Sequence, residues 1–148
     1  MDPKQLEKVS AVARARESQA AAVHQQRLQS ADQSQQRLGQ LEEFRSEYEK
    51  RLSNLAGSGM DARQLAGYRR FLSGLNDAIS RQGETIQRDQ ENVELSRNQL
   101  LEQSTRRMTV EELVAHTRAD LLREEEKREQ KLNDETVIRR HQEPPGGC

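Results

Sequence analysis

The chain has 148 residues, of which 32% are hydrophobic, 33% are charged and 3% are aromatic. A globular domain usually carries about 45–50% apolar residues, so this composition excludes a thick core but supplies a thin seam between two long helices. The formal net charge of −1 and the sequence pI of about 6.3 argue against a nucleic-acid-binding protein.

Composition and chain ends bear on three further classes of protein. Low hydrophobicity favours disorder, but 24 basic residues balance 25 acidic ones, and the body between Pro3 and Pro144 has no proline, which favours helix. No apolar run approaches the roughly 18 residues of a membrane span, and residues 1–5 lack the apolar core of a signal peptide. Cys148 is the single cysteine and cannot form an internal disulfide, so we expect a soluble, cytoplasmic protein.

The first predicted element is a helix over about residues 3–56. Asp2 suits the N-cap, Pro3 suits the first turn, and Gln5 can complete a capping box. The second half follows a heptad repeat, with positions a and d at Leu38, Leu41, Arg45, Tyr48, Leu52 and Leu55. The first half carries a looser apolar stripe made of Leu6, Val9, Val12, Ala13, Ala20, Val23, Leu28 and Ala31.

A strong break follows at residues 57–60. Gly57 and Gly59 are poor helix formers and favour a turn. Asp61 comes next, with Gln64 three residues later, and this pair fits a capping box for a second helix over about residues 61–141.

The second predicted helix has the clearest heptad repeat. Its position a is apolar with one interruption: Leu65, Leu72, Ile79, Ile86, Val93, Leu100, Arg107, Val114 and Leu121. Its position d turns polar towards the middle: Tyr68, Leu75, Gln82, Asp89, Ser96, Gln103 and Val110. We therefore predict a coiled coil whose seam is strong near the turn and wet in its middle.

These elements predict an all-α fold, in which two long helices form an antiparallel coiled-coil hairpin with a C-terminal helical overhang. We expect a single domain over residues 1–148, with a disordered tail at residues 142–148. Residues beyond about 115 have no predicted partner within the chain. Folding about the turn brings together three predicted pairs: Leu55 with Leu65, Tyr48 with Leu72, and Leu6 with Val114.

No residue pattern supports catalysis, a metal site or a cofactor site. The histidines, His24, His116 and His141, have no partners at a convincing ligand spacing, so we interpret them as solvated. Gly57 and Gly59 lack a neighbouring Lys and a following strand, so they do not form a phosphate loop. A two-helix rod offers no pocket that raises a carboxyl pKa. We therefore expect no enzymatic activity, no metal and no cofactor.

All the aromatic residues fall in one window around the turn. Tyr48 and Tyr68 are d residues, which face the seam, while Phe44 and Phe71 are g residues on a shared side of the helix pair. Because a two-helix seam is narrow, the g residues should stay exposed, and an exposed aromatic stripe on a polar protein indicates a binding surface. For the d residues, closure of the hairpin tip is the alternative. The predicted surface consists of Leu41, Phe44, Tyr48, Phe71, Leu75 and Ala78.

Two short motifs flank the predicted turn. Residues 41–48 end the first helix with an aromatic residue followed four positions later by Tyr, and residues 68–82 open the second with Tyr-x-x-Phe-Leu-x-x-Leu. Over about residues 30–90 the chain thereby resembles the FliJ family, small coiled-coil components of the bacterial flagellar export apparatus.

The resemblance implies an antiparallel two-helix coiled coil similar to the central stalk of rotary ATP synthases. It implies that the paired termini enter the hexameric ring of a FliI-like export ATPase and promote its turnover. The face near the turn would bind the cytoplasmic region of a FlhA-like export gate protein, at the cytoplasmic face of the inner membrane. Escort of export chaperones is implied as well.

Carried over position by position, the resemblance assigns gate binding to the six residues of the predicted surface. Less certain partner-binding positions are Arg37, Tyr68 and Gln82. At Arg37 and Gln82 the family is expected to have a neutral amide and a His, so this chain departs from the pattern in its polar fringe.

Two alternative functions remain open. A stalk homologue from an injectisome, the virulence-type secretion system, shares the architecture, and swimming of a deletion strain separates it from a flagellar protein. A homodimeric coiled-coil scaffold would form a stable dimer and would be indifferent to Phe44→Ala or Phe71→Ala. A membrane-surface helix is disfavoured because the chain has acidic clusters and lacks a basic stripe.

Overall fold

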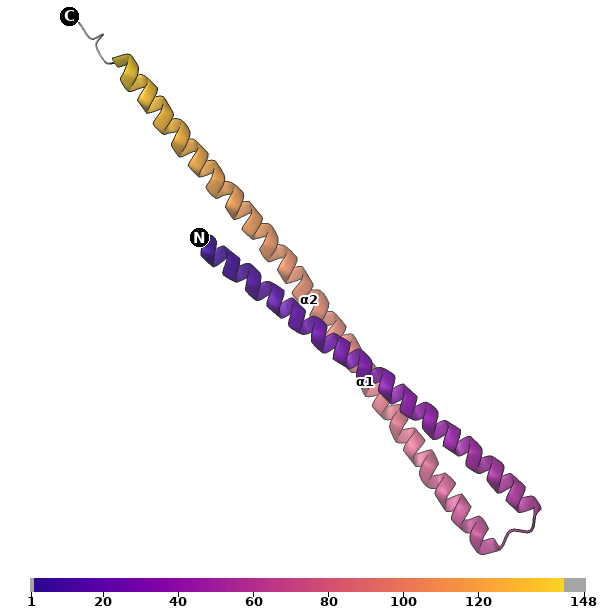
Figure 1. The fold of residues 1–148 in the computed structure, drawn as a ribbon. Coiled ribbons are helices and arrows are strands. Elements are labelled where there is room, and N and C mark those ends of the chain that lie inside the picture. Colours follow the sequence, from indigo (N-terminus) through magenta and orange to yellow (C-terminus); the bar gives the residue numbers. More distant parts are fainter. Residues whose placement is uncertain (1, 143–148) are drawn as a thin grey trace, which may run out of the picture. The chain divides into compact units, whose positions relative to one another are not determined.

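Two long helices account for the described part of the chain. The computed structural model describes residues 2–142, within which α1 spans Pro3–Gly57, α2 spans Ala62–Gln142, and no residue lies in a strand (Figure 1). The predicted all-α helical hairpin is therefore confirmed. Gln142, which we placed in the disordered tail, is the last helical residue, and the rest of that predicted tail, with Cys148, lies outside the described residues.

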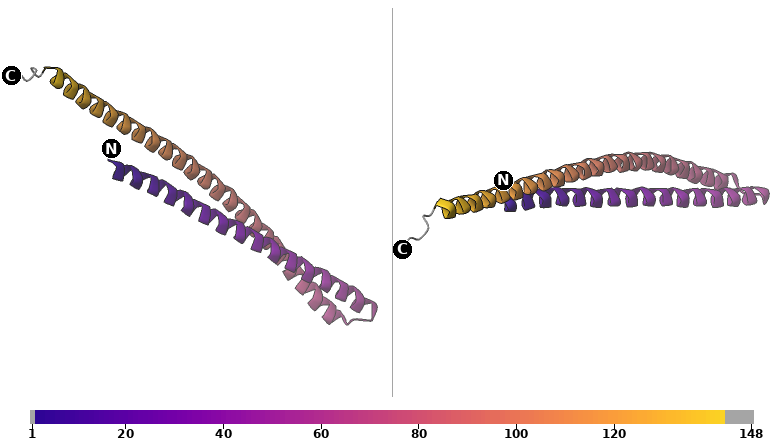
Figure 2. Two further views of the ribbon diagram at one scale, coloured as in Figure 1. Left: turned by 45° about the horizontal axis from the view of Figure 1, so that its top comes forward. Right: turned by 90° about the horizontal axis from the view of Figure 1, so that it is seen from above.

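The helices contribute to two units. The turn unit is Ser18–Glu102, and the terminal unit combines Met1–Glu17 with Gln103–Cys148. Within each unit, a segment of α1 and a segment of α2 lie side by side and antiparallel (Figures 1 and 2). In the terminal unit α2 continues beyond the start of α1, and residues 122–142 are exposed along their whole length, so the predicted overhang is confirmed. The expectation of a single domain stays a prediction.

The start of α1 is closed by the predicted capping box. The Asp2 carboxylate accepts a hydrogen bond from the Lys4 amide at 3.4 Å, and the Gln5 side-chain carbonyl accepts one from the Asp2 amide at 3.3 Å. The box satisfies amides that have no partner within the helix, which explains why the helix begins directly at Pro3.

The turn between the helices depends on a glycine and a second cap. After α1 ends, the Ser58 amide donates to the Leu55 carbonyl at 3.1 Å, and Gly59 adopts a φ of 82°. This left-handed conformation costs other residues about 1–2 kcal/mol. The Asp61 carboxylate then accepts from the Arg63 amide at 3.2 Å, so Asp61 caps α2 as predicted.

The heptad predicted for α2 describes its seam in both units. Every predicted a and d position from Leu65 to Leu121 is buried or half-buried. In the terminal unit, Leu6 and Val114 are buried at 3% and 8% exposure. The regular period, rather than high hydrophobicity, therefore selects the side of α2 that faces α1.

The middle of the seam, in the turn unit, is polar as predicted. The Ser34 hydroxyl donates to the Asp89 carboxylate, and the Gln82 amide donates to the Ser34 backbone carbonyl at 2.8 Å. The Ser96 hydroxyl donates to the backbone of its own helix, so its oxygen accepts from His24 Nδ1 at 2.9 Å. Ser34 and Ser96 are buried and the other groups are half-buried, and each has a partner, which offsets the cost of removing it from water.

The apolar stripe predicted for the first half of α1 is partly wrong. Leu6 and Ala13 are buried, whereas four members of the stripe are exposed: Val9, Val12, Val23 and Leu28. The seam instead keeps a 4,3 spacing that includes polar residues, namely Ser10, Glu17 and His24. Polar residues lie in the seam here because α2 offers them polar partners: Arg107 for Glu17 and Ser96 for His24.

Candidate functional site

An aromatic cluster joins the two helices near the turn. The ring centroid of Tyr48, on α1, lies 4.3 Å from that of Phe71 and 6.3 Å from that of Tyr68, both on α2. The planes are tilted by 33° and 52°, and such tilted aromatic pairs contribute about 0.5–1.5 kcal/mol beyond their burial. The cluster thus ties the predicted surface to both helices.

The predicted surface is partly open to solvent. Phe44 is 54% exposed and Phe71 is 47% exposed, which leaves a large apolar area in contact with water. The remaining members are half-buried beside them: Leu41, Tyr48, Leu75 and Ala78. We call these six residues the aromatic surface.

Phe44 differs from the other aromatic residues in its support. It lies in a shallow groove with Gln40, Glu43 and Glu47, all from its own helix. Among residues 2–142 it has no ring contact, whereas Phe71 packs on Tyr48. Phe44 is therefore the member of the aromatic surface that a partner can bury most easily.

The less certain positions behave differently from one another. Arg37 is exposed, while Tyr68 is half-buried against Tyr48. The Gln82 amide is directed into the seam, where it donates to the Ser34 carbonyl. Gln82 therefore holds the helices together in this structure instead of pointing at a partner.

The groove at the closed end of the turn unit was not predicted from the sequence. This groove of about 560 Å³ is shared by both helices, and its lining includes Leu55, Met60 and Gln64 beside the aromatic cluster. The Arg51 guanidinium carbon lies 5.5 Å from the Tyr48 ring centroid, a cation–π distance. Arg51 follows Tyr48 by three residues, so the helical spacing was a usable signal.

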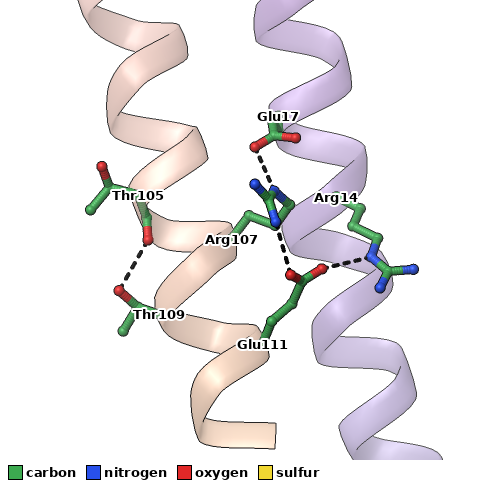
Figure 3. Close-up of polar contacts among 6 residues, drawn as sticks. All are labelled: Arg14, Glu17, Thr105, Arg107, Thr109 and Glu111. Atoms are coloured by element: carbon green, nitrogen blue, oxygen red, sulfur yellow. Dashed lines mark hydrogen bonds and ion pairs between the residues drawn. The ribbon is translucent and has the colours of Figure 1, made fainter. Parts of the chain in front are cut away.

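A charged network holds the terminal unit together (Figure 3). Arg107 interrupts the apolar heptad of α2, and its Nε donates to Glu17 Oε2 on α1 at 2.6 Å. Its Nη1 donates to Glu111 Oε2 at 2.8 Å, and Arg14 Nε donates to Glu111 Oε1 at 2.9 Å. Two basic and two acidic side chains therefore alternate across the helix pair.

The network shifts the pKa values of three of its side chains. The hydrogen bond from Arg107 lowers the pKa of Glu17 below its ordinary value, and the bond from Arg14 is the main cause that lowers the pKa of Glu111. The bond to Glu17 raises the pKa of Arg107. These shifts keep Glu17, Glu111 and Arg107 charged at neutral pH.

Comparison with known proteins decides the family. The model of the flagellar FliJ protein family matches residues 2–146. The chain belongs to the FliJ family. Members of the FliJ family are non-enzymatic components of the flagellar export apparatus, so this chain is a component of that apparatus. No curated protein and no solved structure gives a significant match.

The histidines of this FliJ-family chain correct one expectation. His24, interpreted as solvated, is half-buried and bonds to Ser96, while His116 and His141 are exposed. Within residues 2–142 no cluster of His, Cys, Asp or Glu side chains could hold a metal ion. None of the helices in this described range is long and apolar enough to cross a membrane.

Proposed function

We propose that the chain is a central-stalk-like coiled coil that couples two parts of the flagellar export apparatus. In this proposal the aromatic surface docks on the cytoplasmic region of the export gate protein. The terminal unit enters the ring of the export ATPase and stimulates it, and the chain also escorts export chaperones. A protein with this role works at the cytoplasmic face of the inner membrane.

The exposure of Phe44 and Phe71 carries the gate-docking proposal. Two large rings, 54% and 47% exposed, are unusual on a chain with 3% aromatic residues. Exposed aromatic side chains that sit beside half-buried apolar ones are typical of binding hot spots. The exposed positions around these rings are mostly polar and do not shield them from water. In this proposal a bound partner is what removes the rings from water.

The exposed end of α2 supports ATPase engagement. Residues 122–142 are exposed throughout, although the helix continues to Gln142. Its few apolar side chains, which include Leu122, Leu132 and Ile138, are exposed and gain nothing from burial within the chain. A cavity in another protein, such as the ring of a hexamer, would give this segment the contacts that the chain itself does not provide.

A binding comparison tests the assignment of the two partners. The Phe44→Ala/Phe71→Ala variant should bind the cytoplasmic region of the export gate at least about thirty-fold more weakly, because truncating each aromatic anchor costs about 1–2 kcal/mol. Titration calorimetry measures this change. Stimulation of the export ATPase should remain at the wild-type level, because these residues lie in the turn unit.

Leu95→Ala is the matched control. Leu95 is 61% exposed and belongs to the turn unit but not to the aromatic surface, so its loss should leave gate binding unchanged. Unchanged gate binding by the double variant would remove the assignment of this surface. A stable dimer that ignores both substitutions would instead indicate a homodimeric scaffold. Circular dichroism of each variant separates lost binding from lost fold.

A further inference from the structure

An apolar groove lies in the terminal unit, whereas the aromatic surface belongs to the turn unit. Ala13 and the half-buried Val110 form its floor, and Val9 and Val12, 42% and 50% exposed, contribute apolar wall. Its volume is about 470 Å³, and both helices line it. The small Ala13 side chain is what leaves the floor deep, since a larger residue in the seam would fill the space between the helices.

The rim of this terminal groove is basic. Its lining includes Lys8, Arg16 and Arg106 and no acidic residue. Lys8 and Arg16 form no ion pair with any residue in the described range 2–142. The nearby acidic residues Glu17 and Glu111 are already paired within the charged network. The groove therefore combines an apolar floor with cationic edges.

The terminal unit thus has two unlike sides. Thr105 and Thr109, which line the groove, point to a different side of α2 from Arg107 and Glu111 (Figure 3). The network side is satisfied by its own ion pairs, whereas the groove side leaves valines in water. Two antiparallel helices with one apolar groove form an incomplete three-helix bundle, because a third helix can place its side chains at 3,4 spacing into such a groove.

We propose that the terminal groove binds an amphipathic helix from a partner protein, with a narrow apolar stripe flanked by acidic residues. The apolar stripe would contact Val9, Val12 and Val110, and the acidic residues would pair with Lys8 and Arg16. Residues 8–16 span about 12 Å of helix, so the docked segment is about two to three turns long. This inference goes beyond the proposed function and does not depend on the aromatic surface.

Charge argues against a second copy as the occupant. If two terminal grooves met face to face, Lys8, Arg16 and Arg106 of each copy would approach the same residues of the other, and like charges oppose such a contact. The chain's own overhang carries as many basic as acidic residues, and it also lacks the stripe, because the positions that continue its a register hold Arg128 and Glu135. An acidic amphipathic helix of another protein would place apolar side chains on the floor of the groove and acidic side chains beside its basic rim.

Two synthetic helical peptides of about 20 residues test the proposal on the full chain. Both carry Leu and Ala at 3,4 spacing, and one has Glu at the flanking positions where the other has Lys. The Glu peptide should bind at least about ten-fold more tightly than the Lys peptide by fluorescence anisotropy, and added salt should weaken it. Val12→Asp should abolish that binding, while Phe44→Ala should leave it unchanged.

A charge-reversal variant keeps the test independent of folding. Lys8→Glu/Arg16→Glu should exchange the preference, so that the Lys peptide binds more tightly than the Glu peptide. A variant that had merely unfolded would bind neither, and circular dichroism would reveal it. Gate binding and ATPase stimulation can be measured on the same variants, so failure here and failure of the proposed function are separate results.

Several outcomes would overturn the proposal. Equal binding of both peptides, or full binding by Val12→Asp, would show that the groove does not recognise an acidic helix. A concentration-dependent dimer in sedimentation that Val12→Asp removes would assign the groove to a second copy. Binding of phosphatidylglycerol vesicles through Val12 without peptide binding would assign it to an anionic lipid surface.

Discussion

Arg107 shows how a single residue shapes the seam of the terminal unit. It occupies an a position, where the heptad calls for an apolar side chain, and it donates to Glu17 across the helix pair and to Glu111 on its own helix. A charged residue at such a position loses apolar contact but favours one register and one partner. The valines that a purely hydrophobic seam would use are left on the surface of the groove instead.

The stability of the chain should fall in acid through this network. Glu17 and Glu111 have lowered pKa values, so the unfolded chain takes up their protons at a higher pH than the folded chain does. Their contribution is present above the ordinary carboxyl pKa of about 4.3 and is lost as the pH falls through the lowered values. Thermal unfolding followed by circular dichroism, from about pH 7 to about pH 3, measures the loss.

The Glu17→Gln/Glu111→Gln variant separates the network from general acid effects. Its unfolding temperature should be lower than wild type at neutral pH and should depend less on pH below about 5. Glu125→Gln, in the exposed overhang, should keep the wild-type profile. Identical profiles for wild type and the double variant would show that these ion pairs contribute nothing measurable, as many surface pairs do.

At the scale of elements, the helix ends and the period of the seam decide the fold. The helices begin at caps formed by Asp2 and Asp61, and the chain turns at Gly59. Each of these features depends on residues close together in the sequence, so it can be predicted from the sequence directly. The heptad of α2 was predictable for the same reason, because its a positions keep one period from Leu65 onward. Where apolar residues form the seam, their periodicity is enough to predict which face of the helix packs against its partner.

The first half of α1 could not be assigned by that rule. Val9 and Val12 satisfied an apolar pattern, but the seam uses Ser10 and Glu17, and Glu17 accepts a hydrogen bond from Arg107 on α2. Gln82 is a similar case, since its amide reaches the Ser34 carbonyl across the helix pair. Such cross-helix partners depend on the relative register of two distant segments, which one helix alone does not reveal.

The aromatic surface could be predicted from the sequence more fully than the seam of the first half of α1. The g positions of Phe44 and Phe71 predict exposure, and both rings are exposed. The contact between Tyr48 and Phe71 follows from their closeness to the turn. The identity of a partner could not be predicted in the same way, because the exposure of a side chain does not depend on the shape of the protein that binds it.

The turn offers a paired test of backbone conformation. Gly59→Ala should destabilise the hairpin by about 1 kcal/mol, because a φ of 82° is strained for alanine. Gly57→Ala should be neutral or stabilising by up to about 1 kcal/mol, since Gly57 is the last helical residue and a Cβ there meets open space. Urea unfolding gives both values, and an equal response at the two glycines would contradict the role assigned to Gly59.

At the scale of the whole molecule, α2 extends well beyond the stretch that packs in the seam. Leu121 is the last half-buried residue of α2, and residues 122–142 add helix that is exposed throughout. Most of the stability of the helix pair should therefore come from residues up to this point, while the remainder is available to another protein. The overhang has few apolar residues, so it does not need burial to stay in solution.

Truncation after Leu121 tests this division. The shortened chain should unfold within about 2 °C of the full chain, because the removed residues bury little surface. Binding to the export gate should persist, whereas stimulation of the ATPase should fall to the unstimulated rate if the overhang enters the ring. A large drop in unfolding temperature would show that the overhang packs on the rest of the chain in solution.

The spacing of cross-helix contacts along the chain also sets an order of assembly during synthesis. Arg45 and Asn76 are 31 residues apart, but Arg14 and Glu111 are 97 apart. Loops close more readily when they are short, and each contact made near the turn shortens the loop for the next. Arg14 is synthesised well before its partner Glu111, which follows 97 residues later. Throughout that interval Leu6 and Ala13, which pairing buries, have no partner to cover them, so the segment that carries them is open to aggregation until the matching part of α2 has been made.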